Sequence, residues 1–199
     1  YVPGDSLQQV KEPAYSQDMN NLIGYRLFET FGQQIYDLHA VHSDPHPGNF
    51  AFRPDGSIIL YDFGAVKRIP EETIAKLRSL VADALDGRVE TLDQHLLNIG
   101  VRQANGKEPD AAYYREWIDI VMAPFANDAS YDFSQSNLHR RVMGKMKRDG
   151  MKYIGSFQPS PETMHIDRVI SGHYWTMVDL GVKASFRPLV DKIVLHKAA

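Results

Sequence analysis

Three polar side chains, Asp44, Asn49 and Asp62, have the chemical types that phosphoryl transfer requires. Phosphoryl transfer needs little covalent chemistry from a protein. It depends on positioning and on neutralising the charge of a polyphosphate, which Mg²⁺ does. Because Mg²⁺ binds oxygen, the carboxylate of Asp62 and the amide oxygen of Asn49 are suitable ligands. The second carboxylate, Asp44, can orient or deprotonate an attacking hydroxyl group or water.

The chain around these residues indicates how they could meet. Residues 40–49 contain two prolines and a glycine, which exclude a helix and predict a polar loop. Residues 50–53 and 57–61 flank the turn sequence Pro-Asp-Gly at 54–56, which is a strong hairpin signal. One hairpin fills the interval, so it can return Asp62 to the side of the polar loop.

Helices are predicted on both sides of this polar region. Apolar residues recur every three or four positions from about Ser16 to His39, which predicts a long amphipathic helix before the loop. After Asp62 the chain turns sharply at Gly64, which glycine permits, and the helical period returns. The further predicted helices occupy residues 70–87, 89–97, 114–122, 135–148, 162–180 and 188–197. Irregular segments are expected at residues 1–14, 102–109 and 124–134.

The composition is typical of one globular domain, and the predicted fold class is mainly α with a single inserted β-hairpin. The 199 residues are 43% hydrophobic and 24% charged, enough to bury one core. A net charge of −3 gives no indication of nucleic-acid binding. The absence of cysteine excludes disulfides and thiolate metal sites. No apolar run approaches the ~20 residues that span a bilayer.

The spacing of the polar residues resembles a known pattern. His-x-Asp-x-x-x-x-Asn at residues 42–49, followed by a hairpin and Asp-Phe-Gly at 62–64, is similar to the catalytic and metal-binding loops of the protein-kinase superfamily. The full strings HSDPHPGN (42–49) and LYDFG (60–64) resemble the UbiB/AarF/ADCK family more specifically, which reads His-Ala-Asp-Pro-His-Pro-Gly-Asn and Leu-Asp-Phe-Gly. Later segments, at 159–163 and 179–182, resemble the C-terminal helices of that family.

This resemblance implies a fold and a role for each residue. The fold would be a protein-kinase-like C-terminal lobe, a helical bundle whose β-hairpin carries the catalytic and Asp-Phe-Gly loops. Asp44 would be the catalytic aspartate, and Asn49 and Asp62 would hold Mg²⁺ and ATP. His42 would be the structural histidine that supports the loop, together with Gly64 at the turn.

The resemblance also implies that the chain is part of a larger protein. Residues 1–14 resemble the hinge from an N-terminal lobe that this chain does not contain, and residues 15–199 would be the C-terminal lobe. The sequence begins without Met and carries no signal peptide. It also has no Gly- or Ala-rich phosphate loop before the hinge. We therefore expect the isolated chain to bind ATP weakly and to turn it over poorly.

The implied function is that of an ATP-dependent atypical kinase or ATPase linked to ubiquinone and related isoprenoid-lipid metabolism. The expected partners are a nucleotide, the N-terminal lobe and an anionic or isoprenoid lipid. The expected location is cytoplasmic, at the periphery of a bacterial inner membrane. Two departures from ordinary protein kinases disfavour peptide substrates: Ser43 replaces an Arg and His46 replaces a Lys. The segment from Gly64 to Pro70 is also too short for an activation loop.

Two other functions remain open at this stage, besides the possibility of a polar turn with a chance Asp-Phe-Gly. One is an aminoglycoside- or choline-type phosphotransferase, although those enzymes usually place the metal aspartate in a different tripeptide. The other is a pseudokinase scaffold that binds nucleotide or lipid without chemistry. Such a scaffold would not need to retain Asp44, Asn49 and Asp62 together.

The basic segment 135–148 allows two interpretations. It could be a helix with one solvated face and one core face, the latter formed by Leu138, Val142, Met143 and Met146. It could instead contact anionic lipid headgroups, as polybasic amphipathic helices do. The remaining predictions concern single residues. Surface or core positions are expected for His139, His165, His173 and His196, and core positions for Trp117, Tyr174 and Trp175.

Overall fold

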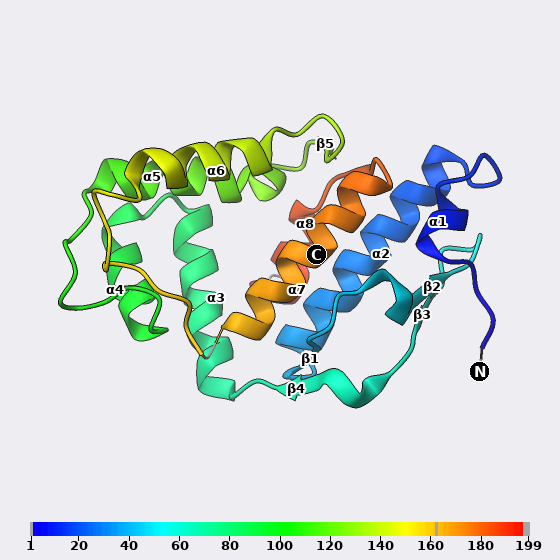
Figure 1. Cartoon of the computed structure of the whole chain (residues 1–199), viewed down its shortest axis with the longest axis horizontal. Helices are drawn as coiled ribbons and strands as arrows, with labels where there is room; N and C mark the ends of the chain where they lie inside the picture. The colour runs from blue at the N-terminus through cyan, green and yellow to red at the C-terminus, as the bar shows by residue number, and fades with distance from the viewer. Residues whose placement is uncertain (1, 162, 197–199) are drawn as a thin grey trace.

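The computed structural model describes residues 2–161 and 163–196. Its centre is α2 (Gln17–Tyr36), which packs against α7 (Met164–Asp179), and both lie beside the short strands in Figure 1. Helix α2 begins at Ser16, whose hydroxyl accepts a hydrogen bond from the backbone N–H of Met19. The long helix predicted before the polar loop is thus confirmed, and it ends at Tyr36.

The predicted hairpin is confirmed. Strands β2 (Phe50–Phe52) and β3 (Ile58–Leu60) pair antiparallel. The turn between them contains Gly56 with φ 79°, a left-handed conformation that glycine adopts without strain.

Two further antiparallel pairs were not predicted. Strand β1 (Ala40–His42) pairs with β4 (Val66–Arg68), and β5 (Tyr131–Asp132) pairs with β6 (Lys183–Ala184). These strands have only two or three residues, too few to show a period of two, and each pair joins segments that are distant in sequence. Nothing local in the sequence could therefore indicate them.

Five further helices follow the predicted order: α3 (Glu71–Leu85), α4 (Val89–Asn98), α5 (Ala111–Val121), α6 (Leu138–Asp149) and α8 (Arg187–Leu189). The short helix α1 (Leu7–Val10) was not predicted. Short 3-10 turns lie at Pro47–Asn49, Phe63–Ala65 and Ala123–Phe125, and a π-helical turn at Val190–Val194.

Several predicted elements differ from the structure. Residues 1–14 were expected to be an extended or turn segment, yet they contain α1, because Ser6 and Gln9 form a capping box. Helix α6 begins at Leu138, not near Gln135. Helix α5 begins at Ala111, not at Tyr114, because Asp110 caps it. The last predicted helix is divided into α8 and the π-helical turn. Other expected bounds, at residues 1, 162 and 197, lie outside the described residues.

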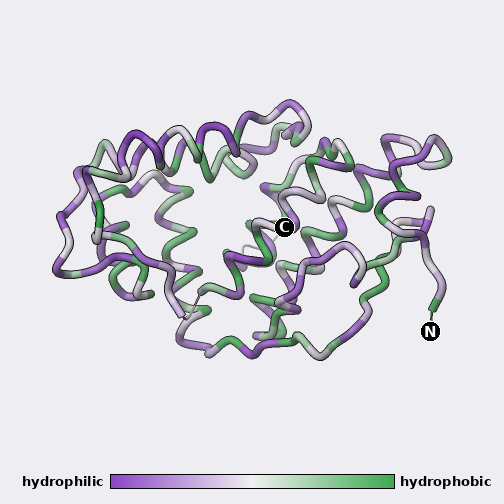
Figure 2. Tube along the Cα trace, in the orientation of Figure 1, coloured by the Kyte–Doolittle hydropathy of each residue, from purple (hydrophilic) through white to green (hydrophobic). Residues whose placement is uncertain are grey.

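Three apolar clusters form the core. The largest joins α2, α7 and the hairpin, and its fully buried members include Ile23, Phe52 and Phe186. A second cluster surrounds Val41, and the third joins α3, α4 and α5 around Leu92. Figure 2 shows apolar and polar residues alternating along the helices, as expected for amphipathic helices around shared cores.

The prediction for the core face of α6 was wrong in part: Leu138 and Val142 are half-buried, but the two methionines are not. Met143 and Met146 are 52% and 55% exposed, while the side chain of Lys145 is 1% exposed. Lys145 is buried because it forms ion pairs with Glu116 and Asp149 and stacks on aromatic rings of α5. The fully buried side chain of α6 is thus a cation, and the spacing of apolar residues in the sequence cannot indicate a buried cation.

Predictions for single aromatic residues had mixed outcomes. Tyr174 packs against the main core, and Trp117 is half-buried. Trp175 is 48% exposed, so its predicted core position was wrong. Of the four histidines, His173 is buried and the others are partly or fully exposed. No helix within the described ranges is both long and apolar enough to cross a membrane.

Candidate active site

The polar loop after β1 is fixed to the Asp-Phe-Gly segment by backbone pairing. Because β1 pairs with β4, residues 43–49 lie next to residues 62–65. Ser43 strengthens this connection, since its backbone N–H and its hydroxyl both donate to the carbonyl oxygen of Ala65, at 3.0 and 2.7 Å. The serine that replaces the usual kinase arginine thus has a structural contact of its own.

The polar loop also orders its own two functional side chains. The amide nitrogen of Asn49 donates to Asp44 Oδ2 at 2.8 Å and to the Asp44 carbonyl oxygen at 3.3 Å. This contact orients the Asp44 carboxylate, whose side chain is 38% exposed. Because Asn49 uses its nitrogen here, its amide oxygen is directed elsewhere and can bind a cation.

His42 lies beneath the site. Its Nε2 is 2.8 Å from the carbonyl oxygen of Asp62 and 3.2 Å from that of Tyr61, so this nitrogen must carry the proton and donate. The residue is 4% exposed, and its Nδ1 has no hydrogen-bond partner among the described residues. His42 therefore links the end of β1 to the segment that carries Asp62.

Asp62 has an unusual backbone conformation. Its φ is 51°, in the left-handed region that a non-glycine residue rarely adopts and that is found disproportionately at functional sites. Its Oδ1 accepts a hydrogen bond from the N–H of Gly64 at 3.2 Å. A Cβ at Gly64 would lie 3.2 Å from that same oxygen, so the glycine gives the carboxylate room. Phe63 points outward and is 66% exposed.

The structure thus brings the predicted residues together. Asp44 and Asn49 are in direct contact, and the carbonyl oxygen of Asn49 accepts a hydrogen bond from the N–H of Tyr61, the neighbour of Asp62, at 2.8 Å. His42 and Gly64 contact the same short segment.

This donor set fits Mg²⁺. It offers one carboxylate, from Asp62, and one amide oxygen, from Asn49, and Mg²⁺ usually combines one or two such ligands with phosphate and water oxygens. Across residues 2–161 and 163–196 there is no cluster of three or more His, Cys, Asp and Glu that could hold a metal.

Sequence reasoning missed the contribution of α7. Its Arg168 lies with Nη2 3.5 Å from Asp44 Oδ1, and its Gly172 packs against Pro45. His173 packs between Phe31 and Phe50, with ring centroids 5.4 and 5.3 Å away. The helix was predicted, but nothing in the sequence indicated which of its faces meets the polar loop.

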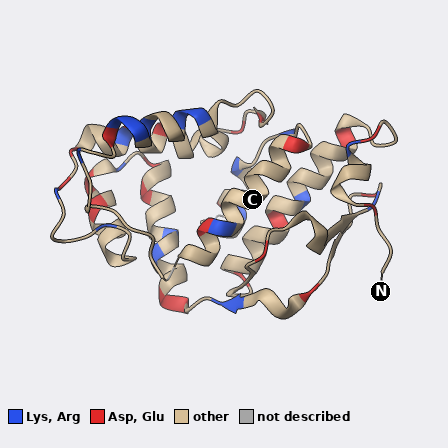
Figure 3. Cartoon of the chain, viewed as in Figure 1, with Lys and Arg blue, Asp and Glu red and all other residues tan. Residues whose placement is uncertain are grey.

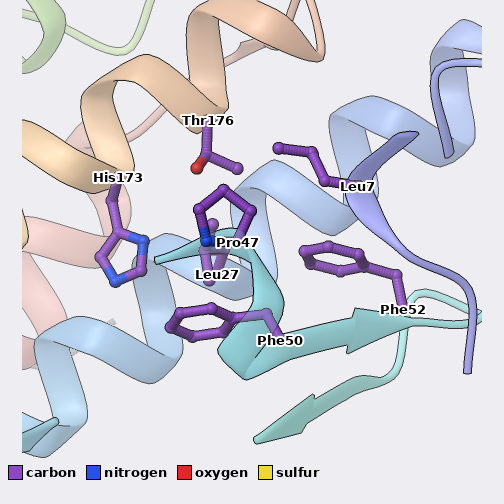
Figure 4. Close-up of a pocket in the computed structure, with 7 residues that line it drawn as sticks. All are labelled: Leu7, Leu27, Pro47, Phe50, Phe52, His173 and Thr176. Carbon is purple, nitrogen blue, oxygen red and sulfur yellow. The ribbon is translucent and has the colours of Figure 1, made fainter. Parts of the chain in front are cut away.

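A small apolar cavity lies under the polar loop (Figure 4). Its lining residues come from α1, α2, α7 and the hairpin: Leu7, Leu27, Pro47, Phe50, Phe52, His173 and Thr176. Its volume is about 10 Å³, far below the ~300 Å³ of a usual small-molecule pocket. Burial lowers the pKa of His173 to about 4, so this imidazole is neutral near pH 7.

The fold is that of a kinase-like C-terminal lobe. A solved structure of Rv3197 from Mycobacterium tuberculosis in complex with erythromycin superimposes with a TM-score of 0.74. It covers 97% of this chain and 48% of its own, at 20% identity, so the likeness concerns the fold alone.

A family model matches the first part of the sequence. Residues 1–96, which include the polar loop and the Asp-Phe-Gly segment, match the model of the ABC1 atypical kinase-like domain. Over these residues, just under half of the chain, the sequence is similar to that family.

Named relatives agree with the family. The mitochondrial atypical kinase COQ8 of Schizosaccharomyces pombe is 28% identical over 201 residues, which cover 100% of this chain and 32% of the relative. The chloroplastic protein ACTIVITY OF BC1 COMPLEX KINASE 7 of Arabidopsis thaliana is 32% identical over 106 residues, covering 53% of this chain and 15% of the relative. Rat mitochondrial COQ8B is 24% identical over 87% of this chain and 33% of its own. The chain thus spans about a third or less of these relatives.

Proposed function

We propose that this chain is the C-terminal catalytic half of an ATP-dependent atypical kinase or ATPase. One observation carries the proposal: the Asn49 amide orients the Asp44 carboxylate, and the Asn49 carbonyl oxygen accepts from the N–H of Tyr61, the neighbour of Asp62. An orienting amide and two carboxylates on paired segments are what phosphoryl transfer from a metal-bound nucleotide needs.

Each residue would have a defined part in the reaction. Asp44 would accept the proton of the attacking hydroxyl group or water. The attacking oxygen forms a bond to the terminal phosphorus, the bond from that phosphorus to the bridging oxygen breaks, and its electron pair leaves with the diphosphate. Asn49 and Asp62 would hold Mg²⁺, which when bound offsets phosphate charge. His42 would keep Asp62 in place through its backbone carbonyl.

We also propose that residues 1–14 connect this lobe to an N-terminal lobe that completes the nucleotide site. In support, the start of the chain lies along the hairpin. The hydroxyl of Tyr61 donates to the Val2 carbonyl oxygen at 2.6 Å, and Asp5 pairs with Phe52 as an isolated bridge. A Cβ at Gly4 would lie 2.6 Å from the side chain of Ile59. The segment thus forms one edge beside the predicted site.

The proposed acceptor is a small molecule or water, with a link to ubiquinone and isoprenoid-lipid metabolism. In support, only β4 and a 3-10 turn lie between Gly64 and Pro70, which leaves little chain on which a peptide could dock. The resemblance to the UbiB/AarF/ADCK family supports the lipid link. The family match does not favour an aminoglycoside- or choline-type phosphotransferase, and no contact in the site favours a pseudokinase.

Lipid contact is proposed for the outer surface of α6. Figure 3 shows Lys and Arg gathered on this helix, and the exposed Met143 and Met146 lie among them. Exposed apolar side chains between cations are the features of a helix that binds at a membrane surface. The corresponding location would be the periphery of a membrane.

The test is Mg²⁺-dependent ATP hydrolysis by the full-length protein that contains this chain, with and without liposomes that contain anionic lipid. Wild type is compared with Asp62→Asn and with Asp128→Asn, an exposed acid that forms no hydrogen bond or ion pair within the described part of the chain. Hydrolysis that requires Asp62 but not Asp128 supports the proposal, and stimulation by liposomes supports the role of α6. Nucleotide binding without hydrolysis under every condition would indicate a pseudokinase scaffold.

A further inference from the structure

One face of α7 lies along the polar loop. Arg168, Gly172 and Thr176 are spaced four residues apart, so they share a face of this helix. Arg168 reaches Asp44 Oδ1 at 3.5 Å, and a Cβ on Gly172 would lie 2.3 Å from the Cβ of Pro45. Thr176 then borders the cavity beside the second proline of the loop (Figure 4). The glycine lets α7 come close enough for Arg168 to reach the site.

The polar loop has no cation of its own. Residues 42–49 contain neither Lys nor Arg, and His46, at the position of the usual kinase lysine, uses its Nδ1 to accept from the N–H of Gly48. The functional groups of the loop are therefore acidic or neutral. Charge that develops on a transferred phosphoryl group needs fixed positive groups near it, and such groups are often the largest contribution to catalysis.

The ion pair between Arg168 and Asp44 is weak. The two side chains are 66% and 38% exposed, and exposed pairs contribute about 0–1 kcal/mol to stability. At 3.5 Å the contact is also longer than a charge-assisted hydrogen bond, which is about 2.8 Å. Within residues 2–161 and 163–196, the guanidinium has no other ion pair or side-chain hydrogen bond. Most of its five donors are therefore available to a phosphate group, whose geometry they match.

We propose that Arg168 is the cation that contacts the transferred phosphoryl group, supplied by α7 in place of a loop lysine. The inference rests on the proposed function. As the acceptor oxygen bonds to phosphorus and the bridging bond breaks, the guanidinium binds the phosphoryl oxygens while Asp44 takes the acceptor's proton. Before nucleotide binds, the same guanidinium is the counter-ion of Asp44, which is the arrangement in the structure.

The test compares Arg168→Gln and Arg168→Lys with Arg115→Gln in the full-length protein. Arg115 is an exposed arginine on α5 with no side-chain ion pair or hydrogen bond in the described residues, so its variant controls for the loss of one charge. Three quantities are measured: the kcat for ATP hydrolysis, the Kd values for ADP and for a non-hydrolysable ATP analogue, and the Tm without nucleotide. The first readout requires turnover, and the other two do not.

We expect Arg168→Gln to lower kcat by about 100-fold, the usual effect of removing one charge-stabilising donor. The Kd for the ATP analogue should rise while the Kd for ADP and the Tm stay unchanged, because only the terminal phosphate meets Arg168. Arg168→Lys should recover part of kcat, and Arg115→Gln should match wild type.

Three results would overturn the inference. They are a kcat within twofold of wild type, a higher kcat that reveals an inhibitory ion pair, and equal weakening of ADP and analogue binding with a lower Tm, which indicates a structural role. These failures are distinct from failure of the proposed function, in which wild type itself shows no turnover that depends on Asp62.

Discussion

Acidic side chains have opposite surroundings in the two halves of the molecule. Among α3–α6 they are paired with bases. Asp83 accepts hydrogen bonds from Thr91, His95 and Arg88, which hold the pKa of its carboxyl far below the usual range. In the polar loop, Asp44 accepts a hydrogen bond from the Asn49 amide and meets Arg168 only at 3.5 Å, and Asp62 accepts from the backbone N–H of Gly64. Acids that form ion pairs with basic residues stabilise the packing of the helices, whereas the acids of the polar loop stay available for a metal or a substrate.

The pairing of acids with bases is clearest at Lys145, the buried cation of α6. Burial by itself would lower the pKa of Lys145, but its hydrogen bonds to Asp149 and Glu116 outweigh this effect, and the pKa is raised. Its ammonium group also lies 4.2 Å from the centre of the Tyr113 ring. A polar group this deep serves the packing of α5 on α6.

The largest effect is expected when an acid of the polar loop is neutralised. Asp44→Asn removes the proposed base without deleting buried atoms, so we expect kcat for ATP hydrolysis to fall about 1,000-fold with little change in Tm. Steady-state kinetics and thermal unfolding of the full-length protein measure the two effects. A large loss of stability would instead mean that Asp44 is a structural residue like Asp83.

At the paired acids of α5 and α6 we expect the opposite result, a loss of stability. Lys145→Met leaves Glu116 and Asp149 without their buried partner, and breaking such a pair should lower the free energy of unfolding by about 3 kcal/mol. Urea denaturation measures the free energy of unfolding. The control is Arg140→Gln, which removes one charge at an exposed position of the same helix. Because Arg148 also contacts both acids, a loss below about 1 kcal/mol would show that it replaces Lys145.

A third prediction concerns the contact that joins α7 to the polar loop. Gly172→Ala places a Cβ 2.3 Å from the Cβ of Pro45, so we expect a loss of about 2 kcal/mol in stability, together with reduced activity as α7 moves away. The matched control is Gly144→Ala in α6, where a Cβ meets nothing within 4 Å. That change should stabilise by about 1 kcal/mol, because alanine favours a helix. Equal behaviour of the two variants would refute the close-packing argument.

The smallest expected effect is a pH dependence caused by His173. The folded pKa is about 4 and the unfolded value about 6.5, so between these values the unfolded chain binds the proton and stability falls as pH falls. From about pH 7.5 to about pH 5.5 we expect the contribution of this residue to fall by about 1.4 kcal/mol. Denaturation of His173→Phe should lack this part of the slope, whereas His139→Phe, at an exposed position, should retain it. Identical slopes in wild type and His173→Phe would contradict the assignment.

Local signals in the sequence were sufficient for several features. The period of three to four indicated α2, and the Pro-Asp-Gly turn indicated the β2–β3 hairpin. The spacing of Asp44, Asn49 and Asp62 indicated the residues that the structure brings together. Each of these depends on residues that are close in the chain, so propensity and turn chemistry act directly.

Local signals failed where contacts join distant segments. The pairing of β1 with β4, the burial of Lys145 and the exposure of Trp175 all depend on which elements pack together. An apolar period cannot distinguish a methionine that faces solvent from one that faces the core when a neighbouring lysine has buried partners.

The sequence by itself therefore determined the order of the main helices, the hairpin and the polar residues that the loop carries, because these follow from short-range spacing. Only the tertiary structure decided that α7 would reach the polar loop, with Gly172 against Pro45 and Arg168 beside Asp44. The physical reason is that the loop itself contains no Lys or Arg, and the cation near it, Arg168, lies on a helix far along the chain. Only the packing of α7 against α2 and β1 brings it within reach.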